Sequence, residues 1–422
     1  MRVLIAGGGI GGLAAALCLH EAGLDVRVCE SVREPRELGV GINLQPAAVR
    51  ELVALGLGDD LERIAIATAG LRYYSKHGKP IWSEPRGREA GFDWPQYSIH
   101  RGQLLMLLYR AAQERLGPDR LRTGHQLVSF EQDPEGVTAT FRDRRAGGVP
   151  HTERGDVLIG ADGIHSTVRA AFYPEEGPPR FGGQLMWRAA VEAPPFLDGR
   201  TMVVVGHRDQ KLVAYPMARR PGGRVLTNWL TELTVPGDTP PVADWNRRVD
   251  KDVFAARFAD WTFPWLDVPA LIAATPEVFE FPKVDRDPIP RWTFGRVTLL
   301  GDAAHPMHPS GSQAGSQAIV DAAVLARAVG EDGAVAGLQR YEAERLPPMR
   351  EVTLRNRRLG PEEMTQVVEE RAPDGFADVE DVISRREMEE LTASFSRSAG
   401  LDRDTLNATT PIVAGLRPAA QG

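Results

Sequence analysis

Residues 3–12 read VLIAGGGIGG, and this stretch decides the fold. Its first four residues form an apolar strand pattern, its glycines form a GxGxxG turn, and a helical pattern follows over residues 13–22. A second strand pattern over residues 26–30 ends in Glu30. A strand, a tight turn, a helix and another strand in this order predict a βαβ unit that binds a dinucleotide.

The glycines of this turn each meet a physical requirement of nucleotide binding. Gly7 permits the tight turn, Gly9 lets the backbone approach a pyrophosphate at the positive end of the helix, and Gly12 allows close packing of helix and strand. The acid at the end of the second strand can accept hydrogen bonds from ribose hydroxyls. NAD and FAD enzymes share this motif, so the motif alone leaves the dinucleotide open. The cofactor contacts expected here are Gly7, Gly9, Ile10, Gly11, Gly12 and Glu30.

Two later motifs place an acid where a strand ends and a helix follows. Residues 160–169 read GADGIHSTVR and contain Asp162, and residues 301–309 read GDAAHPMHP and contain Asp302. An acid at such a position can bind a ribityl hydroxyl, and the helix N-terminus behind it can stabilise negative charge on a reduced flavin ring. An NAD-dependent dehydrogenase would leave the second of these motifs unexplained.

With these motifs the sequence resembles the flavoprotein aromatic hydroxylases, the family of para-hydroxybenzoate and salicylate hydroxylases. GxGxxG with its acid, DGxxSxxR and GDAAH occur in the family's order and at its spacings, from residue 1 to about residue 358. One departure is that Ala314 stands where the family usually has Gly, and Gly315 comes one place later. The resemblance implies FAD contacts by Gly41, Arg101, Asp162, Arg169, Gly301, Asp302 and Gly315.

The resemblance also implies a reaction. NADH or NADPH would reduce the FAD, and O₂ would form a flavin C4a-hydroperoxide that hydroxylates a planar aromatic or N-heteroaromatic substrate. Substrate-region runs such as residues 82–87, 186–188 and 212–216 resemble the family members that act on phenazine carboxylates, so decarboxylative hydroxylation of such an acid is expected. A salicylate-type hydroxylase and a non-catalytic FAD-binding redox protein remain alternatives.

The order of strand and helix patterns along the chain predicts an α/β protein. It has a Rossmann-like FAD-binding domain, an inserted and mainly antiparallel substrate domain, and a C-terminal helical segment. Short alternating runs rich in Trp, Tyr and Pro mark the inserted part. The predicted boundaries are 1–70, 101–177 and 290–358 for the FAD-binding domain, 71–100 and 178–289 for the substrate domain, and 359–422 for the C-terminal segment.

Four residues of the inserted part are candidates for the substrate pocket. Trp187, Tyr215 and Trp229 are either flat walls for a ring or ordinary sheet core, and the Tyr215 hydroxyl is also a candidate hydrogen-bond partner. Arg188 either pairs with a substrate carboxylate or is a solvated arginine at a strand end.

The GDAAH region adds two further pocket candidates. His308 either faces the flavin or is a loop histidine, and Pro309 follows it. His305 and His308 form an HxxH, but no further ligand stands at metal spacing, so no metal is expected. No catalytic acid or base is assigned from the sequence.

Composition excludes several other classes of function. The chain has a formal net charge of -7, 42% hydrophobic residues and 25% charged residues, which gives no basic excess for nucleic acid or membrane binding. Two cysteines offer no disulfide framework, and no signal peptide or membrane span is apparent. A soluble, cytoplasmic enzyme is expected, with a small aromatic substrate, O₂ and NAD(P)H as its partners and an open oligomeric state.

Overall fold

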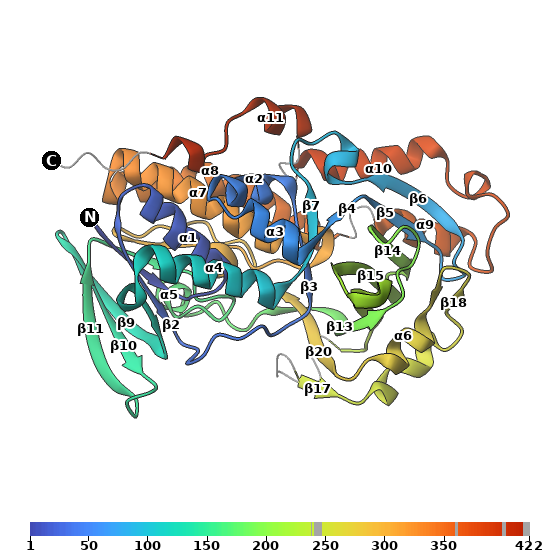
Figure 1. The fold of residues 1–422 in the computed structure, drawn as a ribbon, viewed down its shortest axis with the longest axis horizontal. Helices are drawn as coiled ribbons and strands as arrows, with labels where there is room; N and C mark the ends of the chain where they lie inside the picture. Colours follow the sequence, from blue (N-terminus) through green and yellow to red (C-terminus); the bar gives the residue numbers. More distant parts are fainter. Residues whose placement is uncertain (238, 240–246, 359–361, 399–401, 417–422) are drawn as a thin grey trace.

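A five-stranded parallel sheet lies in one half of the molecule, on the left in Figure 1. In the middle strand, Val3 pairs with Val26 on one side and with Val157 on the other. Val3, Leu4, Ile5 and Ala6 of this strand are buried, because the sheet is covered both by helix α1 and by the antiparallel strand β11 (Val149–Gly155). In spatial order the strands are β21 (Val297–Leu299), β12 (Val157–Gly160), β1 (Arg2–Ala6), β2 (Asp25–Glu30) and β8 (Leu121–Thr123).

The computed structural model describes residues 1–237, 239, 247–358, 362–398 and 402–416. Four long helices accompany the parallel sheet. Helix α1 packs against α4 and α7, and α7 packs against α8. These helices are α1 (Ile10–Glu21), α4 (Arg101–Leu116), α7 (Ala314–Asp332) and α8 (Ala334–Asn356).

The turn between β1 and α1 shows why its glycines are needed. Gly7 has a φ of 109°, a value that side chains rarely allow. A Cβ on Gly12 would lie 2.0 Å from the carbonyl oxygen of Gly7, so the first turn of α1 touches the end of β1. This contact holds the helix N-terminus at the end of the parallel sheet, as the sequence predicts.

An eight-stranded sheet lies in the other half of the molecule, on the right in Figure 1. Its strands are antiparallel except for the parallel pair β14 and β5. This arrangement confirms the predicted fold class. In spatial order the strands are β17 (Arg247–Val249), β20 (Val278–Asp285), β13 (Arg180–Ala193), β16 (Val225–Thr234), β15 (Gln210–Arg219), β14 (Thr201–His207), β5 (Gly70–Tyr74) and β6 (Pro80–Pro85).

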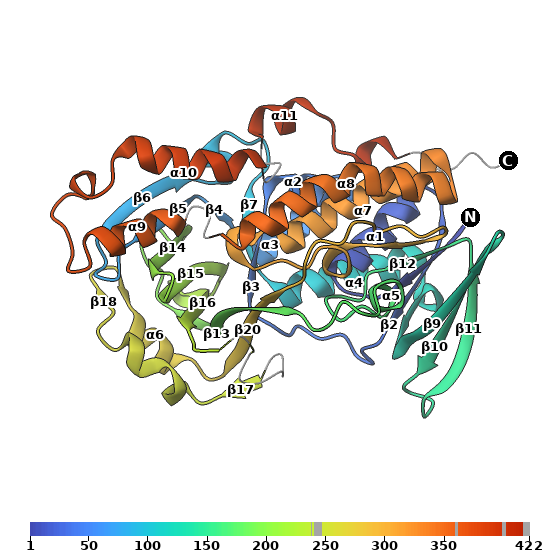
Figure 2. The same ribbon diagram turned by 180° about the vertical axis from the view of Figure 1, so that it is seen from behind.

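In the described residues, the β structure is completed by a two-stranded sheet, β18 (Thr262–Phe263) and β19 (Leu266–Asp267), and by two three-stranded antiparallel sheets. β7 (Gln96–His100) pairs with β3 (Gly41–Leu44) and β4 (Ala65–Thr68), so it does not join the eight-stranded sheet although it falls within the segment 71–100. The other sheet contains β9, β10 and β11 and extends from one end of the molecule (Figures 1 and 2). Its strands are β9 (His125–Asp133), β10 (Gly136–Asp143) and β11 (Val149–Gly155). The domain boundaries given above stay a prediction.

Helices of the C-terminal segment lie against the eight-stranded sheet (Figure 2). Met364 and Val368 of α9 pack in one cluster with Tyr73 and Val204 of the sheet, and Met388 of α10 joins it. These helices are α9 (Glu363–Arg371) and α10 (Arg385–Ser398), whereas α11 (Arg403–Ala408) lies by α2 (Pro46–Ala54), where Arg50 donates to the carbonyl of Leu406.

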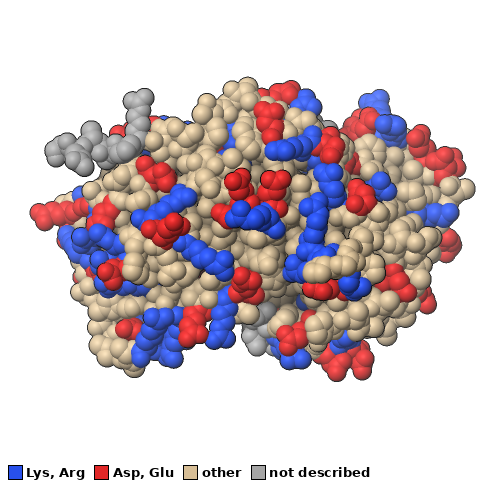
Figure 3. All heavy atoms as spheres, viewed as in Figure 1, with Lys and Arg blue, Asp and Glu red and all other residues tan. Residues whose placement is uncertain are grey.

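The surface and the helices bear on membrane binding. Among the described residues, no helix is both long and apolar enough to cross a membrane. On the face shown in Figure 3, Lys and Arg side chains are interspersed with Asp and Glu side chains.

Candidate active site

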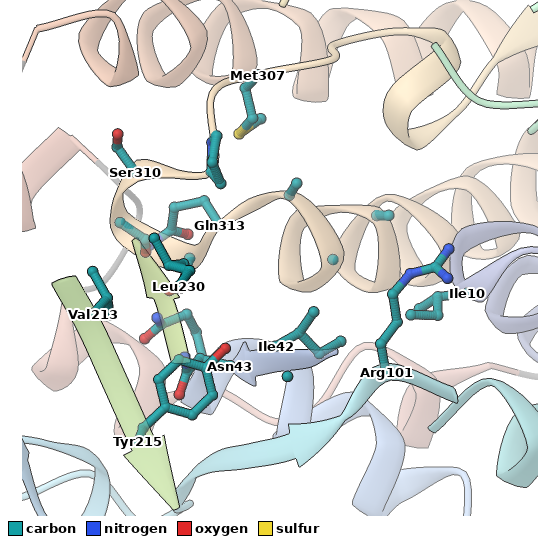
Figure 4. Close-up of a pocket in the computed structure, with 18 of the residues that line it drawn as sticks. Ile10, Ile42, Asn43, Arg101, Val213, Tyr215, Leu230, Met307, Ser310 and Gln313 are labelled. Carbon is teal, nitrogen blue, oxygen red and sulfur yellow. The ribbon is translucent and has the colours of Figure 1, made fainter. Parts of the chain in front are cut away.

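A cavity of about 420 Å³ joins the N-terminus of α1 to one face of the eight-stranded sheet. Figure 4 shows Ile10 and Arg101 toward one side of it and Tyr215, with neighbouring side chains of the sheet, toward the other. The loop over residues 310–313 forms a third wall. The cavity therefore brings the GxGxxG turn, the GDAAH turn and the inserted sheet together.

The side of the cavity formed by the two glycine motifs fits FAD. A Cβ added at Gly9 would meet nothing within 4 Å, so the backbone there is open to a pyrophosphate. The N-terminus of the 12-residue helix α1 borders the same space and supplies the positive end of its dipole. Of the predicted cofactor residues, those lining the cavity are Gly9, Ile10, Gly11, Gly41, Arg101, Gly301, Asp302 and Gly315. Ala314, the departure from the family pattern, lines it as well.

Glu30 lies at the end of β2 and holds the glycine turn. Its carboxylate accepts hydrogen bonds from the backbone N–H groups of Gly8, at 2.5 Å, and Val32, at 2.6 Å. The predicted contact with ribose hydroxyls is compatible with this position, since a carboxylate has four acceptor sites.

The GDAAH turn is held by buried ion pairs behind it. Gly301 has a φ of 61°, and Asp302 is exposed to the cavity but enclosed by protein, so burial raises the pKa of its carboxyl. His305 Nε2 lies 2.6 Å from the Asp321 carboxylate, which also accepts from Arg345 at 2.7 Å. His305 therefore braces the turn. No group of three or more His, Cys, Asp and Glu side chains in the described residues is placed to hold a metal ion.

Asp162 and Arg169 both have partners in the protein and do not line the cavity themselves, although Ala161 and Gly163 beside Asp162 do, so the FAD contact of Asp162 stays a prediction. Asp162 accepts from the backbone of Thr167 at 2.7 Å and from the Ser166 hydroxyl, which fixes the start of the next helix. Arg169 is 1% exposed and pairs with Glu176. It also donates to the carbonyls of Ala303 and Ala304 in the GDAAH turn. The structure thus gives Arg169 a structural role between two cofactor motifs.

The eight-stranded sheet turns every second residue toward the cavity. Arg188 on β13 pairs with Leu230 on β16, which pairs with Val213 on β15, and all three line the cavity. Side chains alternate between the faces of a strand, so the residues next to them point to the opposite face.

Trp187 and Trp229 lie on that opposite face, and the expectation that they wall the pocket is wrong. Trp187 stacks on Phe254 with ring centroids 5.0 Å apart. The indole N–H of Trp229 donates to Thr275 Oγ1 at 2.9 Å, and Trp229 is fully buried. Both tryptophans belong to the hydrophobic core behind the sheet.

His308 and Pro309 separate at the end of the GDAAH segment. Pro309 lines the cavity, whereas His308 does not, which corrects the prediction for the histidine. Its imidazole lies 3.8 Å from the Asp285 carboxylate and close to Gly182, on the side of β13 and β20. Burial lowers the pKa of His308 to about 4.

Tyr215 and Arg188 meet where the FAD side of the cavity joins the sheet. The guanidinium of Arg188 donates at 3.1 Å to the carbonyl of Gly41 and lies beside the Tyr215 hydroxyl. The N–H of Gly41 donates to Asn228 Oδ1 at 2.7 Å. Burial raises the pKa of Tyr215 to about 12, and the Arg188 charge opposes that rise. The phenol therefore stays protonated at neutral pH and can donate a hydrogen bond into the cavity.

Sequence reasoning missed one group of charged residues in this cavity. Lys211 and Glu232 face each other across β15 and β16, and Glu362 reaches them from the segment before α9. A signal existed for Lys211, which stands four residues before Tyr215 on one strand and so shares its face. No local pattern marks Glu362. Lys211, Glu232, Glu362, Tyr73 and Arg86 all line the cavity.

Comparisons with known proteins agree with this site. The family described as FAD binding domain matches residues 1–356. The chain is 46% identical over 361 residues to a phenazine 1,6-dicarboxylic acid hydroxylase from Lysobacter antibioticus, covering 84% of this chain and 89% of that protein. It is 34% identical to a 3-amino-4-hydroxybenzoate 2-monooxygenase from Streptomyces platensis, covering 86% and 88%.

Solved structures show the same fold. Klebsiella pneumoniae HpxO, complexed with FAD and uric acid, is 25% identical with a TM-score of 0.73, covering 96% of each chain. The matched family, these relatives and the fit of the cavity to FAD lead to one assignment. The chain belongs to the FAD-binding aromatic hydroxylases and is an FAD-dependent aromatic monooxygenase.

Proposed function

We propose that this enzyme uses NAD(P)H and O₂ to hydroxylate a planar, phenazine-like aromatic acid at the carbon that bears a carboxylate, with loss of CO₂. The observation that carries the proposal is the continuous cavity between the FAD motifs and the apolar face of the sheet. Leu71, Met202, Val204, Val213 and Leu230 supply flat apolar contact area to a fused ring. The 46% identity to a phenazine dicarboxylate hydroxylase supports the same ring system.

Arg188 and Tyr215 are suited to hold the reacting end of such a substrate. The Arg188 guanidinium is held by its hydrogen bond to the Gly41 carbonyl, and its Nε is buried with no hydrogen-bond partner among the described residues. A carboxylate would satisfy that donor. The Tyr215 hydroxyl keeps its proton and can donate a hydrogen bond to a substrate oxygen or ring nitrogen.

Bound FAD supplies the electron and oxygen chemistry, and the protein contributes position, water exclusion and charge. In balance, the ring acid, O₂, NAD(P)H and a proton give the hydroxylated ring, CO₂, NAD(P)⁺ and water. Oxygen added at the carboxylate-bearing carbon interrupts the aromatic ring, and departure of CO₂ restores it.

The test compares phenazine-1-carboxylate, phenazine-1,6-dicarboxylate and salicylate as substrates of the FAD-loaded enzyme. NAD(P)H consumption, product mass and CO₂ release are measured together. We expect both phenazine acids to accelerate NAD(P)H oxidation and to yield a hydroxylated product with CO₂. Turnover of salicylate alone would overturn the phenazine assignment, and a hydroxylated product that keeps its carboxylate would overturn the decarboxylative step.

A further inference from the structure

Four charged side chains form a buried row on the sheet side of the cavity. Lys211 Nζ lies 2.6 Å from a carboxylate oxygen of Glu362 and 2.9 Å from one of Glu232. Lys283 Nζ lies 3.2 Å from Glu232 on its other side. Lys211, Glu232 and Lys283 are each at most 4% exposed. The row thus runs Glu362, Lys211, Glu232, Lys283 and is neutral as a whole.

Without Glu362, the charges of the row do not balance. Its two lysines and one glutamate carry a net charge of +1, and Glu362 supplies the missing anion. Glu362 belongs to the C-terminal segment and follows residue 356, the last residue that the family match covers. An uncompensated charge in such a buried place is costly, so the position next to Lys211 requires an anion.

The position next to Lys211 lies some way along β15 from Tyr215, which is proposed to hold the reacting end of the substrate. Lys211 lies four residues from Tyr215 on the same face, a separation of roughly 13 Å by strand geometry. Side chains from both ends line the same cavity. A fused ring system with an acidic group at each end can contact Arg188 and Lys211 together, whereas a single-ring acid leaves one end without a contact.

We propose that Lys211 binds a second acidic group of the substrate, and that Glu362 occupies this position until the substrate displaces it. Lys211 is then a specificity-determining residue that favours a fused-ring dicarboxylate over a monocarboxylate. This inference rests on the proposed function, because it places the first carboxylate at Arg188 and Tyr215.

The experiment measures the dissociation constants of phenazine-1,6-dicarboxylate and phenazine-1-carboxylate from the change in FAD absorbance, without turnover. The variants are Lys211→Met and Glu362→Gln. Glu369→Gln is a matched control, because Glu369 of α9 pairs with Lys76 at 2.6 Å but neither residue lines the cavity.

We expect Lys211→Met to raise the dissociation constant of the dicarboxylate about tenfold, since one charge-assisted contact is lost. The dissociation constant of the monocarboxylate should stay nearly unchanged. Glu362→Gln should lower the dissociation constant of the dicarboxylate severalfold, because a neutral amide competes less well than a carboxylate for Lys211. Glu369→Gln should change neither constant. The opposite signs of the two cavity variants separate this effect from a general loss of folding.

Equal weakening of both ligands by Lys211→Met, or no tightening in Glu362→Gln, would overturn the inference. Binding of both phenazines without product would overturn the proposed function alone, because the ratio of the two constants still reports on Lys211. If neither phenazine binds to the parent enzyme, both proposals are wrong.

Discussion

The Arg188 guanidinium lies beside the Tyr215 hydroxyl and its charge opposes the rise in the pKa of that phenol, so the two side chains form one polar unit on the cavity face of the sheet. Tyr215→Phe removes the donor that this unit offers to a substrate. We expect kcat/KM to fall by about tenfold with FAD content unchanged, as for the loss of one hydrogen bond to a charged group. Steady-state kinetics with the best phenazine acid measure it.

The matched control is Tyr74→Phe, because Tyr74 lies on the next strand but one and packs in the core behind the sheet. This variant should keep the kcat/KM of the parent. A loss of the same size in both variants would mean that Tyr215 acts only through packing.

The same phenol predicts a pH dependence of stability. Its pKa is about 12 in the folded protein because of burial, and about 10 when the chain is unfolded. The unfolded chain therefore loses this proton first, and stability falls as the pH rises from about 10 to about 12. Below that window the group contributes no slope. Chemical unfolding of the parent and of Tyr215→Phe at several alkaline pH values should show a shallower decline in the variant, and parallel declines would contradict the assignment.

Gly41 has no space for a side chain. A Cβ there would lie 2.5 Å from Met217 Sδ and 2.6 Å from Tyr215 Cε2. Gly41→Ala should destabilise the protein by about 1–3 kcal/mol through overpacking and should raise KM by displacing Tyr215. Gly315→Ala is the control in the same cavity, because its Cβ would meet only Ile42, at 3.8 Å. Thermal unfolding of both apoproteins tests the difference, and equal melting temperatures would count against this packing.

Arg169 is expected to stabilise the fold. Arg169→Met leaves Glu176 without this partner and frees the carbonyls of Ala303 and Ala304. We expect a loss of about 3–5 kcal/mol in the free energy of unfolding, typical of breaking a buried ion pair. Arg180→Met removes an exposed pair with Asp287 and should cost less than about 1 kcal/mol. The test is denaturant unfolding of the two variants. An equal loss of unfolding free energy in both would show that Arg169 is not a structural residue.

Glu30 is expected to control FAD affinity. Glu30→Arg removes the acceptor of the Gly8 N–H and puts a cation beside the turn, so the FAD dissociation constant should rise by about tenfold or more. Glu34→Arg makes the same charge change at an exposed side chain nearby and should leave the constant unchanged. Titration of the apoproteins with FAD, followed by flavin fluorescence, distinguishes the two. Unchanged affinity in the Glu30 variant would remove this acid from the cofactor site.

The FAD side of the site could be predicted from the sequence because its signals are local. The turn from Gly7 to Gly12 is specified by spacing within one stretch, and the close contact of Gly12 with Gly7 is the packing that this spacing requires. The fold class followed for the same reason, since strand and helix periods are visible along the chain.

The substrate side depends on information that a single segment lacks. Trp187 and Arg188 are neighbours, and only the pairing of β13 with β16 decides which of them faces the cavity. Arg169 matches a cofactor motif, but two of its partners, the carbonyls of Ala303 and Ala304, lie more than a hundred residues away in the GDAAH turn. Glu362 reaches Lys211 across 151 residues of sequence, and no periodicity indicates that contact.

The packing of Met364 and Val368 against the sheet has an evolutionary consequence. Glu362, which stands next to these residues and lines the cavity, lies beyond residue 356, where the family match ends, so mutations there can alter which molecules are accepted while every flavin-binding motif stays intact. Exchanging this tail between homologues is then a route to new substrate ranges that preserves the oxidative chemistry.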